Sequence, residues 1–315
     1  MTDIDLLAQT APNRAALAAK EFVGALAPSQ VLLTDVRRGG VPDEFRAAAH
    51  WPRTRPSFDR CAPGTGRTDP LLVAETLRQL GIYLPLRCYG VAADSRVLIE
   101  ELRFDLDTSP PGPAAPRTSY KGMEILCAAT VDRGVRGVSA DGAGRLRNIG
   151  LKVRLSAGGR EFARADGVAR MLSPAAYRAV RNRRPGMTGP EDARLTPVDP
   201  GRVGVKRQDD VLVAVDTRGA VRIAPTDPHH PFFHDHPSDH LTGMVLVGAV
   251  QQTAALQANE PNLRLRSCTL RALRFTDPTP PATVEFGPDG RFEIRQHGSV
   301  TATGEAEFEA VDDQS

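Results

Sequence analysis

DPLLVAETLRQLGI, residues 69–82, and TGMVLVGAVQQTAA, residues 242–255, are two mainly apolar stretches that align at an offset of 173 residues. In this alignment Leu71 faces Met244 and Gln79 faces Gln252. Two further pairs of segments resemble each other in the same order: VLLTDVRRG (31–39) with VLVAVDTRG (211–219), and VLIEELRF (97–104) with CTLRALRF (268–275). Each match is short, but their common order indicates two copies of one structural unit.

Both aligned stretches are expected to form buried helices. Asp69 is a favourable N-cap residue, and Pro70 takes the first helical position, where its missing N–H is not needed. The residues that follow are apolar on most sides, as in a helix enclosed by a sheet. Strand-like segments separated by glycine and proline come next in each copy. They are 95–106, 122–131 and 151–156 in the first copy, and 266–275, 283–287, 291–298 and 300–310 in the second, with a turn at 288–290.

The predicted fold class is therefore α+β. Each copy is expected to wrap an antiparallel sheet around one long central helix, which is the hotdog arrangement. Two such repeats predict a pseudo-dimeric double hotdog, with an N-terminal repeat at 1–182 and a C-terminal repeat at 206–315. The proline- and glycine-rich range 183–205 is predicted to be the linker. The double hotdog is expected to act as a monomer or as a homodimer.

Composition favours a globular protein of the cytoplasm. Hydrophobic residues make up 41% of the chain and charged residues 25%, and the net charge of +2 does not favour nucleic acid as a partner. No apolar run approaches the roughly 20 residues that span a bilayer, so no membrane association is expected. The N-terminus does not resemble a secretion signal. The four cysteines are scattered, without a CxxC pair, and are predicted to be structural.

Several motifs resemble the AfsA-type family, the A-factor (γ-butyrolactone) biosynthesis proteins of actinobacteria. They are VLLTD (31–35), HWP (50–52), DPLLVAETLRQ (69–79), SPAAYRAVR (173–181) and, most specifically, DHPSDHLTGMVL (235–246). The resemblance implies an acyltransferase that moves a β-ketoacyl group from an acyl carrier protein thioester to the hydroxyl of dihydroxyacetone phosphate. The product would lead to butyrolactone, butenolide or furan signalling molecules. No cofactor is implied.

The segment PFFHDHP (231–237) also looks like the approach to the central helix in hotdog dehydratases, which pair a histidine there with a carboxylate of the partner hotdog. This resemblance assigns the role of base to His236. The second copy departs from the family, because Gly248 stands where a glutamate is usual, and a histidine early in the chain is missing. The first copy keeps Glu75. We therefore expect one asymmetric site in which His236 works with Glu75.

Other residues complete the predicted site. Asp239 is expected either to bind the N–H groups of the first helical turn or to hold His240. The backbone N–H groups of Gly243 and Met244, at the start of the helix, are predicted to form the oxyanion hole, since they have no intrahelical partners. Arg78 and Arg274 are candidates for binding the acceptor's phosphate.

Plainer interpretations stay open at this point. The histidines of the loop could bind zinc, but their spacing fits no standard site, and we expect no metal. His234 and His240 could only cap or fill the loop, and Glu75 could simply pair with Arg78 along the helix. The alternative functions are a hotdog dehydratase or thioesterase acting on acyl thioesters, and a non-catalytic acyl-binding relative.

Overall fold

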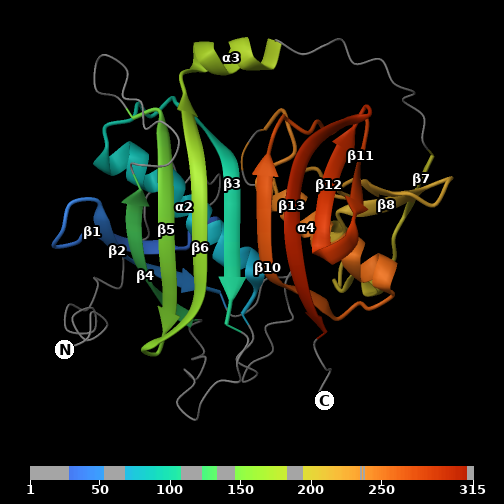
Figure 1. The fold of residues 1–315 in the computed structure, drawn as a ribbon, viewed down its shortest axis with the longest axis horizontal. Coiled ribbons are helices and arrows are strands. Elements are labelled where there is room, and N and C mark those ends of the chain that lie inside the picture. Colours follow the sequence, from blue (N-terminus) through green and yellow to red (C-terminus); the bar gives the residue numbers. More distant parts are fainter. Residues whose placement is uncertain are drawn as a thin grey trace. The chain divides into compact units, whose positions relative to one another are not determined.

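In a computed structural model of the protein, the described residues are 28–52, 68–107, 123–132, 146–182, 194–234, 236 and 238–310. They fall into two compact units, each with one long helix and an antiparallel sheet (Figure 1). The first unit runs to residue 177, apart from residues 100–103, which group with the second unit from residue 178 onward. No described helix is both long and apolar enough to cross a membrane.

The first unit is a sheet with the strand order β1-β2-β4-β5-β6-β3. The pairs from β1 to β6 in this order are all antiparallel. Its elements are η2 (Pro28–Gln30), β1 (Leu33–Arg38), β2 (Glu44–Trp51), α2 (Pro70–Cys88), β3 (Arg96–Leu106), β4 (Met123–Asp132), β5 (Asn148–Ala157) and β6 (Arg160–Leu172). The short helix α3 (Pro174–Asn182) follows and carries no buried residue.

Helix α2 is the core of the first unit. The Asp69 carboxylate accepts a hydrogen bond from the N–H of Leu71 at 2.8 Å, and Pro70 begins the helix, so the predicted start is confirmed. From Pro70 to Leu80 every residue is buried, and the helix packs on β1, β5 and β6. Alternate side chains of β4 and β5 are buried, as expected for strands with one face on a core.

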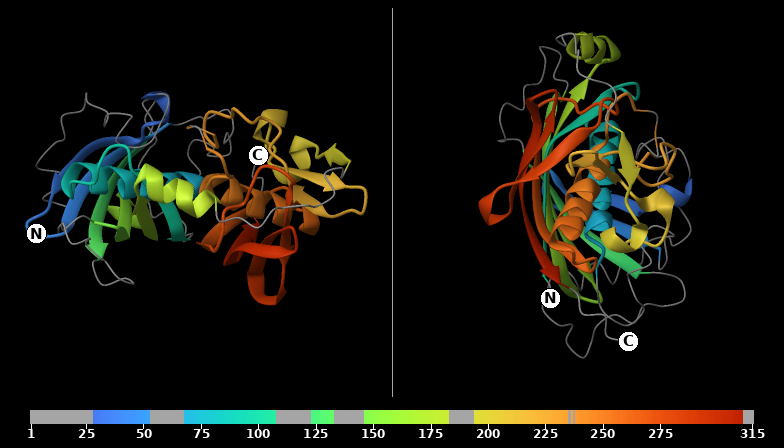
Figure 2. Two further views of the ribbon diagram at one scale, coloured as in Figure 1. Left: turned by 90° about the horizontal axis from the view of Figure 1, so that it is seen from above. Right: turned by 90° about the vertical axis from the view of Figure 1, so that its right-hand side faces the viewer.

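The second unit has the strand order β10-β13-β12-β11-β9-β8-β7. Helix α4 (Gly243–Ala258) lies on one face of these strands (Figure 2). The remaining elements are β7 (Leu195–Pro197), η3 (Pro200–Val203), η4 (Gln208–Asp210), β8 (Val213–Asp216), β9 (Val221–Ile223), β10 (Leu263–Ala272), β11 (Ala282–Phe286), η5 (Pro288–Gly290), β12 (Arg291–Gln296) and β13 (Ser299–Ala310). Within the range predicted as a linker, β7 and η3 are regular elements, and β7 pairs with β8.

The sequence repeat has a direct structural counterpart in two glutamines. In α2, Gln79 accepts a hydrogen bond from the N–H of Leu32 at 2.9 Å and donates one to the carbonyl of Gln30 at 2.8 Å. In α4, Gln252 accepts from the N–H of Leu212 at 2.7 Å and donates to the carbonyl of Asp210 at 2.8 Å. Each central helix is thus fastened by the same side chain to the segment that leads into its own unit's strands.

The repeat breaks down at Leu-Arg-Phe. In the first copy Leu102 and Phe104 are buried in β3 and Arg103 is exposed between them, as strand alternation predicts. In the second copy β10 ends at Ala272, before the motif, and Leu273 is 58% exposed. Identical residues therefore take different environments in the two copies.

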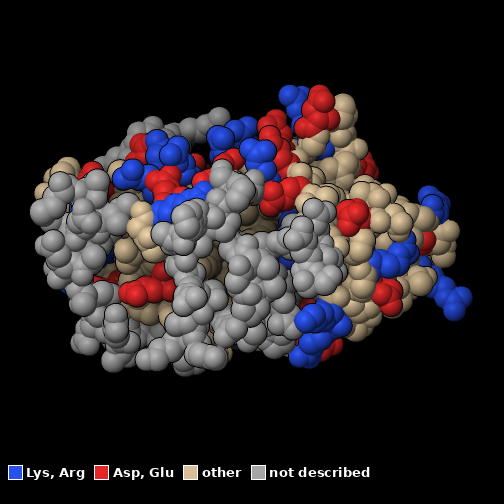
Figure 3. Space-filling model, turned by 90° about the horizontal axis from the view of Figure 1, so that it is seen from below, with Lys and Arg blue, Asp and Glu red and all other residues tan. Residues whose placement is uncertain are grey.

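Acidic and basic side chains are interspersed over the described surface of the face drawn in Figure 3. Charged side chains of the strands form ion pairs, such as Lys152–Asp132 at 3.1 Å and Arg164–Glu161 at 2.6 Å. These pairs are exposed and contribute little to stability.

Candidate active site

The loop that leads into α4 is folded around His230. Its Nε2 donates to the carboxylate of Asp210 at 3.0 Å, and its Nδ1 accepts from the N–H groups of Phe232 and Phe233 at 3.1 and 3.3 Å. Nδ1 must be the unprotonated nitrogen, because both backbone partners are donors. His230 and Asp210 are almost completely buried. Both nitrogens of this histidine therefore hold the loop, which makes it a structural residue.

Helix α4 begins with a side-chain cap supplied by Thr242. Its hydroxyl lies 3.3 Å from the N–H of Val245 and donates to the carbonyl of Phe233 at 3.1 Å. Gly243 and Met244 follow as the first two helical residues, the former partly exposed and the latter buried. Their N–H groups lie in the turn that lacks intrahelical acceptors, as expected for oxyanion donors. Whether they bind an oxyanion stays a prediction.

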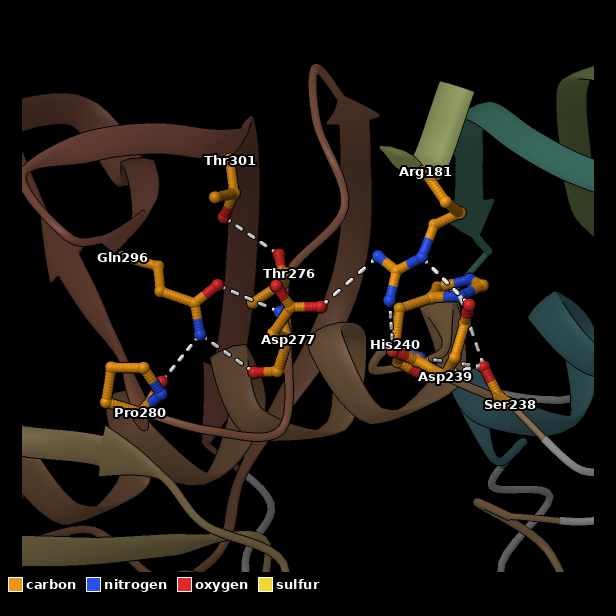
Figure 4. A network of polar contacts seen from close by, with 9 residues as sticks. All are labelled: Arg181, Ser238, Asp239, His240, Thr276, Asp277, Pro280, Gln296 and Thr301. Carbon is orange, nitrogen blue, oxygen red and sulfur yellow. Dashed lines mark hydrogen bonds and ion pairs between the residues drawn. The ribbon is translucent and has the colours of Figure 1, made fainter. Parts of the chain in front are cut away.

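Asp239 holds His240, which is one of the two contacts expected for it; the helix cap comes from Thr242 instead. The Asp239 carboxylate lies 2.9 Å from His240 Nδ1 (Figure 4). The hydroxyl of Ser238 lies 3.2 Å from the same nitrogen and donates to the carbonyl of His240 at 2.7 Å. Two oxygens of the loop therefore fix this imidazole.

Arg181, from helix α3, binds the other side of Asp239. Its Nε donates to the Asp239 carboxylate at 2.8 Å and its Nη2 to the Asp239 carbonyl at 2.6 Å. Its Nη1 lies 3.2 Å from the carboxylate of Asp277 (Figure 4). Sequence reasoning did not single out Arg181 as a site residue, although it belongs to the SPAAYRAVR motif.

Phe275 gives Arg181 and His240 a common apolar support. The Arg181 guanidinium lies 4.7 Å from the centre of the Phe275 ring, and the His240 ring meets it edge-on at 4.8 Å. Behind it, Asp277 is fixed through its backbone, because its N–H donates to Gln296 at 2.9 Å and its carbonyl accepts from the same amide at 2.8 Å. The Gln296 amide thus fixes the backbone of Asp277, one of the carboxylates that bind Arg181.

Two histidines of this loop, His234 and His240, have a lowered pKa. Burial lowers the pKa of His240; Arg181 and His236 lower it further, whereas Asp239 opposes the shift. Burial also lowers the pKa of His234, with a smaller effect from His230. Since the usual value is about 6.5, both imidazoles are unprotonated at pH 7. His236 lies partly buried between them in the sequence.

The predicted partner Glu75 lies in the first unit, in a buried polar cluster on α2. Arg78 donates to both of its carboxylate oxygens, at 2.7 and 2.8 Å, and Gln79 donates to one of them at 2.7 Å. The plainer pairing of Glu75 with Arg78 along the helix is therefore present. His236 belongs to the second unit, so its pairing with Glu75 stays a prediction.

In the second unit the position equivalent to Glu75 is filled. A Cβ atom added to Gly248 would lie 2.6 Å from a methyl carbon of Leu212 and 3.2 Å from the Phe233 ring. No carboxylate fits there unless these buried side chains move. The neighbouring Gln251, aligned with Arg78, has a buried amide oxygen without a hydrogen-bond partner among the described residues. The polar cluster of the first unit is thus not repeated.

The remaining candidates are distributed as follows. Arg274 is exposed, and its side chain forms no ion pair with any described residue. Burial raises the pKa of the Cys127 and Cys268 thiols to about 12, so neither is a thiolate nucleophile. Cys61 lies outside the described residues. Within the described ranges, no group of three or more His, Cys, Asp or Glu side chains could hold a metal ion.

An antiparallel sheet packed on one long buried helix defines a hotdog protein. The chain belongs to the AfsA family, since the model of the A-factor biosynthesis hotdog domain matches residues 7–173 and 187–267. This confirms the family and the hotdog fold expected from the sequence motifs.

The chain is similar to curated members of known name. It is 29% identical over 271 residues to a 2-oxo-3-(phosphooxy)propyl 3-oxoalkanoate synthase of Streptomyces virginiae, covering 85% of this chain and 86% of that protein. It is 30% identical over 276 residues to the synthase of the same name from Streptomyces griseus, covering 85% of each. A solved acyl-ACP thioesterase from Bacteroides thetaiotaomicron is 12% identical, with a TM-score of 0.44 over 84% of this chain and 97% of that one. No functional inference follows from that weaker likeness.

Proposed function

We propose that the protein is an acyltransferase that joins a β-ketoacyl group to the hydroxyl of dihydroxyacetone phosphate. The product of this reaction is the ester named in the synthases that the chain resembles over 85% of their length. The observation in the fold that carries the proposal is the histidine-rich loop directly ahead of the N-terminus of α4, in which burial lowers the pKa of His234 and His240. The acyl donor in this proposal is a thioester on an acyl carrier protein.

Acyl transfer from a thioester to an alcohol needs a base and a group of donors for the tetrahedral oxyanion. An imidazole side chain suits the first task. The resemblance to hotdog dehydratases assigns it to His236. The N–H groups of Gly243 and Met244 suit the second task, because they carry the positive end of the helix dipole. One such donor contributes roughly 3 kcal/mol to transition-state stabilisation.

The acceptor's phosphate requires a cation that is not already neutralised. Arg78 is buried and bidentate on Glu75, so binding phosphate would require it to leave that carboxylate. Arg274 is exposed and forms no ion pair with a described residue, which makes it the better candidate of the two. A guanidinium matches a phosphate with two parallel hydrogen bonds.

The proposal includes the arrangement of the two units as paired hotdog repeats. The paired glutamines and the matching order of elements support two hotdog repeats joined as a pseudo-dimeric double hotdog. In such an arrangement the first copy supplies Glu75 and the second supplies His236, and the filled position at Gly248 leaves the reverse combination without a carboxylate. The enzyme would then have a single site.

The test is mass spectrometry of the purified protein with a β-ketoacyl thioester, with and without dihydroxyacetone phosphate. A phosphorylated β-ketoester that forms only when the acceptor is present supports the proposal. Release of free β-keto acid regardless of acceptor would identify a thioesterase, and binding without turnover a non-catalytic relative. The pairing of His236 with Glu75 requires that His236→Ala and Glu75→Ala both lose turnover. Full turnover in Glu75→Ala alone would refute it.

A further inference from the structure

We infer that His240, held by Asp239 and positioned through Arg181, takes the proton of the acceptor hydroxyl, a role that the family resemblance gives to His236. This inference rests on the proposed acyl transfer and names the residue of that site that moves the proton. It follows from the contacts of the loop 238–240 and of helix α3, which bring together a base, its carboxylate and a cation.

The hydrogen bonds of His240 determine which of its nitrogens carries the proton. Asp239 can only accept, and the Ser238 hydroxyl already donates its hydrogen to the His240 carbonyl. Both oxygens near Nδ1 therefore require an N–H there, at 2.9 and 3.2 Å. In the neutral imidazole the lone pair is then on Nε2, the nitrogen that acts as base.

His230 makes the opposite arrangement and serves as an internal comparison. There Nε2 donates to the carboxylate of Asp210, and the lone pair on Nδ1 accepts two backbone N–H groups. Its basic nitrogen is thus occupied by the fold. In both histidines the nitrogen that faces the aspartate carries the proton, so the lone pair is on Nδ1 in His230, where the backbone uses it, and on Nε2 in His240.

The charged groups around His240 come from three parts of the unit. Asp239 and His236 belong to its own loop, Arg181 comes from α3, and Asp277 follows β10 and binds the same guanidinium. Asp239 raises the pKa of His240, while burial, Arg181 and His236 lower it. This balance keeps the imidazole neutral near pH 7 and leaves Asp239 able to stabilise the imidazolium that forms when a proton arrives.

The reaction step can be written with all atoms accounted for. The acceptor hydroxyl oxygen forms a bond to the thioester carbonyl carbon while its proton passes to His240 Nε2. The tetrahedral intermediate then collapses, the C–S bond breaks, and the sulfur of the carrier takes the proton back from Nε2–H. The products are the ester and the free carrier thiol. Gly243 begins α4 only three residues after His240, so base and oxyanion donors come from one short segment.

Arg181 is a positioning residue, because it reaches His240 only through Asp239. Its Nε holds the Asp239 oxygen that His240 does not use, and its Nη2 holds the Asp239 backbone. Its own place is fixed by Asp277 and by the Phe275 ring. Removing the Arg181 side chain should leave His240 in place but with a less well fixed Asp239 beside it.

The first experiment compares kcat in His240→Asn with the wild type. Asparagine keeps a donor near the place of Nδ1, so the contacts with Asp239 and Ser238 survive while the base is lost. We expect kcat to fall by about 100-fold or more, the usual contribution of general base catalysis, with an unchanged Tm. Nitrogen NMR of wild-type His240 should show a proton on Nδ1 and none on Nε2.

The second experiment measures the pH dependence of kcat/KM, and here the two supporting residues predict opposite shifts. Asp239→Asn removes the group that raises the pKa of His240, so the acidic limb should move to lower pH. Arg181→Met removes a group that lowers it, so the limb should move to higher pH. Arg181→Lys retains the charge and should restore much of the wild-type profile. Arg178→Met, on the same helix but exposed, is the matched control and should leave the profile unchanged.

The outcomes separate the inference from the function on which it rests. If the wild type makes no ester, both are overturned. If the wild type makes ester and His240→Asn does so at the wild-type rate, the function stands and the inference is wrong, and loss in His236→Asn would then identify His236 as the base. If both histidine variants lose activity, opposite shifts in Asp239→Asn and Arg181→Met support His240, and unshifted profiles refute it.

Discussion

Gln252→Met tests whether the glutamine of each central helix fastens that helix to its own unit. Methionine has nearly the length and helix propensity of glutamine but no amide. The substitution removes the acceptor of the Leu212 N–H and the donor to the Asp210 carbonyl, and both of these residues are at most 2% exposed. Leaving a buried polar group unsatisfied costs about 1–3 kcal/mol, so two such groups predict a loss of about 2–6 kcal/mol.

The loss should be local before it is global, because the bonds serve only the segment leading into β8. Hydrogen exchange followed by mass spectrometry should therefore show lost protection in peptides around residue 212, with unchanged exchange around residue 32. Gln79→Met should give the converse pattern. Gln257→Met, at an exposed position of α4, is the control and should change neither. Equal protection at residue 212 in Gln252→Met and the wild type would show that the amide does not fasten the helix.

Three further predictions concern packing, acid stability and thiol chemistry. Gly248→Glu should lower the free energy of unfolding by at least about 1–3 kcal/mol, the usual effect of overpacking, measured by urea denaturation; unchanged stability would show that the position has room. Asp216 has a pKa lowered by its hydrogen bond to Arg222, so its stabilisation is present above the unfolded-state pKa and is lost as the pH falls through the folded value. Urea unfolding between pH 3 and pH 7 should accordingly show a shallower acid decline in Asp216→Asn, and equal slopes would contradict this. Cys127 and Cys268, whose pKa values burial raises to about 12, should resist alkylation at pH 8 until the protein unfolds, as followed by mass spectrometry; rapid labelling of the folded protein would contradict the burial.

The sequence predicted the central helices and most of the strands, for identifiable reasons. An apolar stretch led by an aspartate and a proline specifies where α2 begins, and the PDG turn specifies the corner between β11 and β12. The strands β2, β6, β7 and β9 were not predicted. In β2, Ala47, Ala48 and Ala49 are all buried in succession, so the alternation that marks a half-buried strand is absent.

The candidate site was harder to derive because its groups meet only in three dimensions. The motif DHPSDHLTG indicated which loop carries the histidines, and one of the two roles suggested for Asp239 matches its contact with His240. Nothing local in the sequence indicates that Arg181, 58 residues earlier, binds this aspartate. Nor does spacing distinguish His230, whose two nitrogens hold the fold, from His240.

The two glutamines also lie close to the position at which the two aligned helices differ. Each lies one helical turn after the position that differs between the copies, Glu75 in α2 and Gly248 in α4. In α4 the glutamine binds the backbone of Leu212, and the side chain of that same leucine occupies the space a carboxylate would need. Leu212 therefore has two roles: its backbone binds Gln252, and its side chain leaves no room for a carboxylate at position 248.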